Sequence, residues 1–232
     1  MTKMIPPFLS GVLYPTMCMI CNEDHTIGEE SKLCFGCLAN MPWTNHFKTK
    51  KNAAAPKLWG RLPCLDVASM INFYSHTNIK AMIHRLKYEG RKDIGYYLGR
   101  MAGLKAKESP FFKDIDLIVP IPLHETKRIK RGYNQAAYFG EGVSDILEIP
   151  MDEGVISKIK HTESQTKLSR VQRVKNVFDS FELNSRSDIE GRHILIVDDV
   201  LTTGATIEAC GNHLLEARGV KISVLTACIA RR

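Results

Sequence analysis

The feature that most restricts the fold of this chain is a short apolar run that ends in two acidic residues. Ile194–Val197 predict a buried strand, and Asp198 and Asp199 follow at its carboxyl end. In open α/β sheets, this end of a strand faces the ligand crevice. A turn of small residues then opens a helix, where free backbone N–H groups can meet a phosphate. The residues of this turn are Thr202, Thr203, Gly204, Ala205 and Thr206.

This arrangement has a functional and a structural interpretation. Two adjacent carboxylates beside a phosphate-binding turn suit the hydroxyl groups of a ribose, or a divalent metal ion that bridges them to a ligand. The alternative is an ordinary strand–turn–helix unit whose acidic residues are solvated and cap the helix. The pattern by itself leaves both interpretations open.

Strand-type and helical patterns alternate along the rest of the chain. We expect strands at residues 66–74, 117–122, 154–159, 193–197 and 221–229, and helices at residues 77–88, 94–107, 135–147 and 206–217. The polar stretch 161–175 predicts a loop that runs into a helix. Strands that alternate with helices imply an α/β fold, with a mostly parallel sheet flanked by helices.

Four of the seven cysteines are clustered near the N-terminus. Cys18, Cys21, Cys34 and Cys37 form the pattern Cys-x2-Cys-x12-Cys-x2-Cys. Each Cys-x2-Cys turn directs two thiolates at one centre, and two such turns complete a tetrahedron of sulfur around Zn2+. Four protein ligands leave no open position, so we expect a structural zinc site. The alternatives are a redox-active cysteine pair, unligated cysteines or an iron–sulfur cluster.

The chain divides into three parts by composition and texture. We expect an N-terminal four-cysteine zinc module at residues 1–43, a polar and basic linker at residues 44–60, and the α/β domain at residues 61–232. No run approaches the roughly 20 apolar residues that membrane insertion requires. Prolines interrupt the apolar start of the chain and no small-residue cleavage site follows it. We therefore expect a cytoplasmic protein whose thiolates stay reduced.

The formal net charge of +7 indicates an acidic partner. The densest basic run comprises Lys127, Arg128, Lys130 and Arg131, and further basic residues surround Tyr88 or lie within residues 167–175. A polyphosphate needs only a few of these charges. The surplus could follow the backbone of single-stranded DNA with bases stacked on tyrosine, or form a solvated basic face. Candidate nucleic-acid contacts are Arg85, Lys87, Tyr88, Lys127, Arg128 and Tyr133.

Several motifs between Cys18 and Ala230 resemble those of a known family. They are Leu86-Lys87-Tyr88-Glu89-Gly90-Arg91, Val119-Pro120-Ile121-Pro122-Leu123-His124, Lys130-Arg131-Gly132-Tyr133-Asn134-Gln135-Ala136, Gln165-Thr166-Lys167-Leu168-Ser169 and Val197-Asp198-Asp199-Val200-Leu201-Thr202-Thr203-Gly204-Ala205-Thr206. The last resembles the phosphoribosyl-pyrophosphate loop of type I phosphoribosyltransferases. Together they resemble the ComF family, in which a small zinc module precedes a phosphoribosyltransferase-like domain.

The resemblance implies a donor site for phosphoribosyl pyrophosphate with Mg2+. It implies that Asp198 and Asp199 meet the ribose hydroxyls and that Thr202–Thr206 hold the 5′-phosphate. The loop around Val119 and Pro120 would face the pyrophosphate, near Lys130 and Arg131. The implied reaction is transfer of a 5-phosphoribosyl group to a nucleophile with release of pyrophosphate.

One departure concerns the acceptor. In purine-salvage relatives, an acid that acts on the base stands third after the acidic pair, whereas this chain has Thr202 there. The sequence therefore identifies no general base and no acceptor. The family also includes proteins linked to DNA uptake in competence. A second hypothesis is an accessory protein that binds single-stranded DNA, works with competence or DNA-processing proteins, and keeps the sugar-phosphate pocket as a relic or a sensor.

Overall fold

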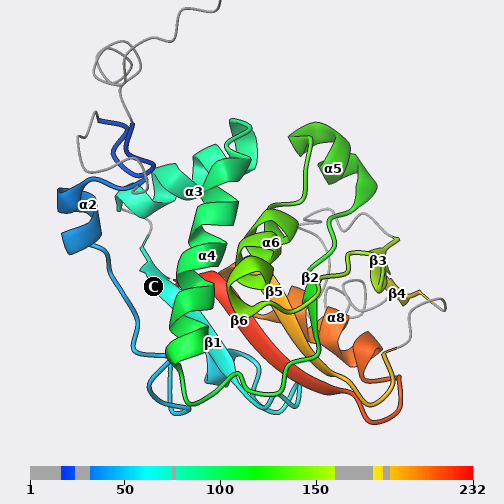
Figure 1. Cartoon of the computed structure of the whole chain (residues 1–232). Coiled ribbons are helices and arrows are strands. Elements are labelled where there is room, and N and C mark those ends of the chain that lie inside the picture. The colour runs from blue at the N-terminus through cyan, green and yellow to red at the C-terminus, as the bar shows by residue number, and fades with distance from the viewer. Residues whose placement is uncertain (1–16, 24–31, 75–76, 160–179, 185–188, 232) are drawn as a thin grey trace, which may run out of the picture.

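The centre of the computed structural model is a four-stranded parallel sheet with the strand order β1-β6-β5-β2 (Figure 1). The structure describes residues 17–23, 32–74, 77–159, 180–184 and 189–231. The parallel strands are β1 (Val67–Phe73), β2 (Leu117–Pro120), β5 (His193–Leu201) and β6 (Lys221–Ala230). A separate antiparallel pair joins β3 (Ile156–Lys158) to β4 (Phe181–Leu183). The predicted α/β fold with a parallel sheet is confirmed.

Helices cover both faces of the parallel sheet (Figure 1). The longer ones are α3 (Asn78–Tyr88), α4 (Lys92–Glu108) and α6 (Gln135–Leu147) on one face and α8 (Ala205–Leu214) on the other; α2 (Phe35–Ala39), η1 (Ala55–Lys57) and α5 (Glu125–Arg131) are short. Because both faces are covered, β5 is apolar on each: Leu195 packs towards α4 and α6, and Ile194 packs towards α8. Within the described part of the chain, no helix has the length and apolarity needed to cross a membrane.

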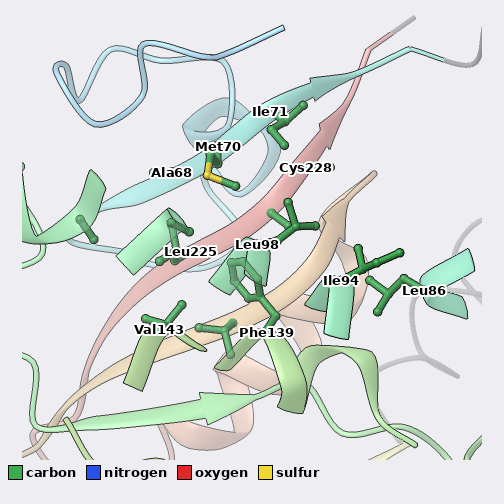
Figure 2. Packing of buried hydrophobic residues seen from close by; sticks show 14 of the residues in the cluster. Ala68, Met70, Ile71, Leu86, Ile94, Leu98, Phe139, Val143, Leu225 and Cys228 are labelled. Atoms are coloured by element: carbon green, nitrogen blue, oxygen red, sulfur yellow. The ribbon is translucent and has the colours of Figure 1, made fainter. Parts of the chain in front are cut away.

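The two longest helices, α4 and α6, approach each other through glycine. A Cβ atom on Gly99 would lie 2.0 Å from the carbonyl oxygen of Phe139, and a Cβ on Gly142 would lie 2.1 Å from that of Tyr96. Only glycine permits such close backbone contact. The Phe139 ring then packs with its neighbours over the sheet, as Figure 2 shows. This packing places the start of α6 beside the carboxyl end of β2 and β5.

Strand β5 is longer than the sequence predicted. Its apolar run ends at Val197, but its pairing with β6 continues to Leu201, which lies opposite Ile229. Hydrophobicity alone predicts that the strand ends at Val197. Hydrogen bonding to the neighbouring strand β6 continues it to Leu201. The acidic pair therefore lies inside β5, close to its carboxyl end.

Residues 44–60, which we predicted as a linker, pack against the sheet. The Thr44 N–H donates to the Met70 carbonyl at the edge of β1, at 3.0 Å. The buried His46 accepts a hydrogen bond from the Ser69 N–H at Nδ1, at 3.2 Å. Leu58 is also buried, in the same core as α8. Most of the segment buries isolated side chains rather than one continuous face, and only its end, from Ala54, has apolar residues four apart. The division into residues 1–43 and 61–232 stays a prediction.

The cysteine-rich part packs on the same core as α3. Cys18 and Ile20 are buried in the hydrophobic cluster that includes Leu86 of this helix. Arg85 is buried as well, and its Nη2 donates to the carbonyl oxygen of Ile20. The expectation that Arg85 contacts nucleic acid is therefore wrong, because its guanidinium is used inside the protein.

Candidate functional site

The two aspartates of the acidic pair face opposite sides of the sheet, since consecutive side chains of a strand alternate. Asp199 lies on the α3 side and is 7% exposed. Its Oδ2 lies 3.0 Å from Lys87 Nζ, but this buried oxygen makes no hydrogen bond with any described residue. Lys87 is thus a counter-ion of the acidic pair, and its role as a nucleic-acid contact stays a prediction. The Asp199 carboxylate keeps the capacity to accept a hydrogen bond from a ligand hydroxyl.

Asp198 lies on the other side of the sheet and is partly buried. Burial and the neighbouring Asp199 carboxylate raise the pKa of Asp198 to about 7, against the opposing effects of Lys87 and Lys158. Lys158 belongs to β3, and burial, followed by the charge of Lys127, lowers its pKa. The acidic pair therefore has a lysine on each face. Lys158 was not predicted as a site residue, because this lysine lies outside every motif and approaches the acidic pair only when the chain folds.

The phosphate loop, residues 202–206, joins β5 to α8 through a sharp turn. Gly204 has a φ of 84°, a left-handed conformation that favours glycine. The first helical hydrogen bond runs from the Glu208 N–H to the Gly204 carbonyl, at 2.8 Å. The amides that precede Glu208 therefore have no acceptor inside the helix. The Thr203 hydroxyl accepts one long hydrogen bond, 3.4 Å, from the Ala205 N–H. The loop thus offers backbone donors at the positive end of the α8 dipole.

The loop that follows β2 lies at the same end of the sheet. Val119 and Pro120 are buried residues at the end of β2, and Pro120 lines the pocket that opens there. The Ile121 N–H donates to the Val197 carbonyl at 2.9 Å, and Asn134 Nδ2 donates to the Ile121 carbonyl at 3.1 Å. A pocket of about 190 Å3 opens beside this loop; its lining includes Pro120, Asn134, Arg128 and Lys158.

The basic run lies on α5, next to the carboxyl end of β2. Arg128 and Lys130 are exposed, and Lys127 is partly buried. Arg131 is held in place, because its Nη1 donates to Gln135 Oε1 at 2.8 Å. The Arg131 guanidinium also lies 5.4 Å from the centroid of the Tyr88 ring. The run therefore contains exposed charges and one arginine that is fixed by packing.

The two candidate stacking tyrosines have different surroundings. Tyr88 is 57% exposed, with the Arg131 guanidinium against it and the His84 ring centroid at 4.9 Å. Tyr133 donates its hydroxyl hydrogen to the Leu86 carbonyl and meets the ring of Tyr138 edge-on at 5.4 Å. Tyr88 can offer a ring face to a base, whereas Tyr133 serves the internal packing of α3 and α6.

The four clustered cysteines come together as their spacing predicted. Their sulfur atoms all lie within 4.8 Å of one another. Cys18 Sγ accepts hydrogen bonds from the Ile20 and Cys34 N–H groups, both at 3.4 Å, and Cys34 Sγ accepts one from the Cys37 N–H at 3.4 Å. Burial raises the pKa of Cys21 and Cys37, whereas backbone N–H donors lower the pKa of Cys18 to about 6 against the effect of its burial. Such N–H donors stabilise thiolates, so the cluster could hold a metal ion through four sulfur ligands.

Comparisons with known proteins identify relatives of this chain. The family model described as "Phosphoribosyl transferase domain" matches residues 134–232. "Competence protein F" of Haemophilus influenzae is 29% identical over 214 residues, which cover 88% of this chain and 92% of that protein. "DNA utilization protein YhgH" of Escherichia coli K12 is 28% identical over 217 residues, which cover 91% and 89%. The chain is a homologue of competence protein F.

The resemblance to the ComF family is thereby confirmed, and the fold is that of a type I phosphoribosyltransferase. The matched domain contains α6, β5, the phosphate loop and β6, and the parallel sheet has helices on both faces. Among solved structures, "Structure of the allosteric regulatory enzyme of purine biosynthesis" overlaps 61% of this chain and 29% of that one, with a TM-score of 0.41 and 18% identity.

Folding brings together only part of the predicted site. Asp198, Asp199 and the phosphate loop lie at one edge of the sheet together with Lys87. The motif Gln165-Thr166-Lys167-Leu168-Ser169 and the basic residues of 167–175 lie outside the described residues.

Lys57 and Arg61, which contact the phosphate loop, were missed because the stretch around them was interpreted as a linker or as the start of the domain. The spacing of Ala54, Leu58 and Leu62, four residues apart, was the available signal that this stretch packs.

Proposed function

We propose that this protein binds phosphoribosyl pyrophosphate together with Mg2+ and transfers the 5-phosphoribosyl group to an acceptor. The observation that carries the proposal is the buried Oδ2 of Asp199, which lies at the edge of the sheet that also bears the phosphate loop and accepts no hydrogen bond from the described residues. A ribose hydroxyl supplies the missing donor. The adjacent loop supplies N–H groups for a 5′-phosphate. The match of residues 134–232 to the phosphoribosyl transferase domain supports the same ligand.

The residues present also fit a magnesium ion bound with the donor. The groups at this edge are carboxylate, hydroxyl and carbonyl oxygens, which are the ligands that Mg2+ prefers. When bound, the ion would offset the charge of the pyrophosphate. The protein's own contribution is to orient the sugar on Asp198 and Asp199 and to hold its phosphate on residues 202–206.

The proposed reaction is a displacement at the anomeric carbon. The nucleophile of the acceptor bonds to C1 of the ribose while the bond from C1 to the pyrophosphate oxygen breaks, and the electron pair leaves with pyrophosphate. The two carboxylates lie where positive charge develops on the sugar. Lys158, Lys130 and Arg131 are the cations available to the leaving group at the β2 side. Thr202 has no acidic group, so the phosphate loop supplies no base to the acceptor.

Calorimetry with phosphoribosyl pyrophosphate and Mg2+ tests the donor site. The double substitution Asp198→Asn/Asp199→Asn should weaken binding about 100-fold, since it removes two charged acceptors, while circular dichroism stays unchanged. Glu108→Gln is the matched control, because Glu108 is an exposed acid at the distant end of α4. Equal affinity in wild type and the double variant would refute the role of the acidic pair.

We also propose that the cysteine cluster holds a structural Zn2+ and that residues 1–43 depend on it for folding. The support is the set of four sulfurs within 4.8 Å and the N–H donors that surround them. Four thiolates need a reducing compartment, which favours the cytoplasm. Elemental analysis of purified protein should find one zinc per chain, and a purified folded protein without metal would contradict this proposal.

A second function, binding of single-stranded DNA, is favoured by the surface of α3 and α5. Tyr88 offers an exposed ring that is backed by Arg131 of α5, the helix that also carries the exposed Arg128 and Lys130. One relative is named a competence protein and another a DNA utilization protein. Fluorescence anisotropy with labelled oligothymidine should show about tenfold weaker binding for Tyr88→Ala. Arg128→Gln/Lys130→Gln should reduce the salt dependence of binding. Binding that is independent of salt would exclude this function.

A further inference from the structure

We infer that Lys57 and Arg61 are positioning residues that hold the phosphate loop in its anion-binding conformation. The inference rests on the proposed function for the identity of the anion. It concerns residues 52–62, which we call the strap. The strap lies outside the matched phosphoribosyl transferase segment, residues 134–232. Lys57 contacts Thr202, which is 145 residues later in the sequence, and Arg61 contacts Thr203, which is 142 residues later.

The contacts between the strap and the loop involve two consecutive carbonyl groups. Lys57 Nζ donates to the Thr202 carbonyl oxygen. Arg61 Nη2 donates to the Thr203 carbonyl oxygen at 2.8 Å. The strap also touches Gly204 directly, because a Cβ there would lie 2.8 Å from the Lys57 carbonyl oxygen. The loop therefore lies against the strap with its carbonyl side.

Because the peptide bond is planar, these contacts also fix the direction of the neighbouring backbone N–H groups. In a trans peptide, the C=O of one residue and the N–H of the next point in opposite directions. Because the carbonyls of Thr202 and Thr203 point at the strap, the N–H groups of Thr203 and Gly204 point away from it. No described residue accepts a hydrogen bond from either N–H. The strap thus leaves two consecutive backbone donors directed outward at the start of α8.

The strap itself is anchored at both ends. Near its start, Asn52 Nδ2 donates to the Val67 carbonyl of β1 at 2.8 Å. Near its end, Asn212 Nδ2 of α8 donates to the Arg61 carbonyl at 3.3 Å. Between them Leu58 is buried, at 1% exposure. Since the strap is fixed to the sheet and to α8, its cations present the loop with a rigid surface rather than a flexible one.

Arg61 has a second contact that concerns charge. Its Nη1 lies 2.8 Å from Glu208 Oε2, and Glu208 stands in the first turn of α8. A carboxylate in this turn would repel a bound phosphate. Arg61 neutralises this charge while its Nη2 holds the Thr203 carbonyl. One guanidinium therefore both holds the Thr203 carbonyl and neutralises the Glu208 carboxylate. The single ammonium of lysine does not reproduce this pair of contacts.

Amide hydrogen exchange on the full chain without ligand tests the strap directly. In Lys57→Met/Arg61→Met, the amide of Glu208, which donates to the Gly204 carbonyl, and the amides that follow it in α8 should exchange at least about tenfold faster than in wild type, because the loop that opens the helix loses its partners. Lys51→Met is the matched control, since Lys51 has an exposed side chain just before the strap. Exchange that stays at the wild-type rate in the double variant would overturn the inference.

Calorimetry with phosphoribosyl pyrophosphate and Mg2+ separates charge from shape. Arg61→Met should weaken binding about tenfold, and Glu208→Gln in the same chain should recover at least about threefold, because the unmasked carboxylate is gone. Arg61→Lys, which keeps the charge and preserves the fold, should fall between wild type and Arg61→Met. An Arg61→Met variant with wild-type affinity, or no recovery with Glu208→Gln, would overturn the charge-masking role. If wild type does not bind phosphoribosyl pyrophosphate, the proposed function is contradicted. The exchange experiment would still test whether the strap holds the phosphate loop.

Discussion

The cysteine cluster and the phosphate loop are both turns that must hold several groups at a fixed spacing, yet their supports differ. The four sulfurs come from residues 18–37, and their hydrogen-bond donors lie within the same stretch. The phosphate loop is held by Lys57 and Arg61, which are more than 140 residues away. The first turn is local and could hold a metal ion, whereas the second is assembled by the fold. Substitutions in the two turns should therefore have different kinds of effect.

The largest effect is expected in the local turn. Cys34→Ser removes one of the four sulfur ligands, and with it the sulfur that accepts a hydrogen bond from the Cys37 N–H, so zinc should be lost. Structural zinc in small modules contributes about 10 kcal/mol or more of apparent binding free energy. We expect residues 17–23 and 32–43 to lose protection in hydrogen exchange, while the parallel sheet keeps its protection.

Elemental analysis and exchange mass spectrometry check this prediction. Cys64→Ser is the control, because Cys64 lies outside the cluster. Retention of one zinc per chain in Cys34→Ser would show that the cluster does not act as a four-ligand unit.

An intermediate effect is expected in the assembled turn. Gly204→Ala introduces a side chain at a φ of 84° and places its Cβ 2.8 Å from the Lys57 carbonyl oxygen. We expect a loss of about 2–3 kcal/mol in the free energy of unfolding, of which about 1 kcal/mol is backbone strain. Gly191→Ala isolates the strain, because Gly191 has a φ of +72° and no neighbouring atom near its Cβ. Urea denaturation of both variants gives the difference, and equal losses would show that the contact with Lys57 is unimportant.

The smallest effect concerns pH and the acidic pair. Burial, together with Asp199, raises the pKa of Asp198 to about 7 in the folded protein, against about 4 in the unfolded chain. Between these values the folded state binds more protons, so stability should fall as pH rises from 4 to 7. Asp198→Asn removes this contribution.

Thermal unfolding from pH 4 to pH 8 measures the difference. The melting temperature of Asp198→Asn relative to wild type should rise as the pH increases from 4 to 7 and should level off above pH 7. Glu108→Gln, at an exposed position, should run parallel to wild type throughout. A constant difference between Asp198→Asn and wild type would show that Asp198 titrates at its ordinary pKa.

Much of the fold was predictable from local patterns. The helix over Gln135–Leu147 agrees with its prediction at both ends, because its apolar spacing is bounded by an Asn134 cap and a left-handed Glu148. Strand β1 agrees to within one residue at each end. Short elements were missed, among them α5 and β4, because few residues give no usable period. The predicted end of β5 was wrong, because pairing with β6, rather than hydrophobicity, decides where that strand stops.

The candidate site was predictable in its motifs and not in its surroundings. Asp198, Asp199 and the phosphate loop stand out because a carboxylate pair and small residues follow an apolar run. Arg85 and Lys87 were both interpreted as surface cations, since charge in a sequence carries no information on burial. In the structure, one pairs with a carbonyl of the cysteine-rich part and the other with Asp199.

The sequence by itself determined the four-cysteine cluster, the α/β class and the position of the acid-containing strand. These features depend on spacing within a few residues, which the chain carries directly. Only the tertiary structure decided that the acidic pair has a lysine on each face and that residues 52–62 support the phosphate loop. The contacts of Lys87, Lys57 and Arg61 join segments more than 100 residues apart in the chain. They follow from packing both faces of one parallel sheet, because only that packing brings Lys87 to Asp199 and Lys57 and Arg61 to the phosphate loop.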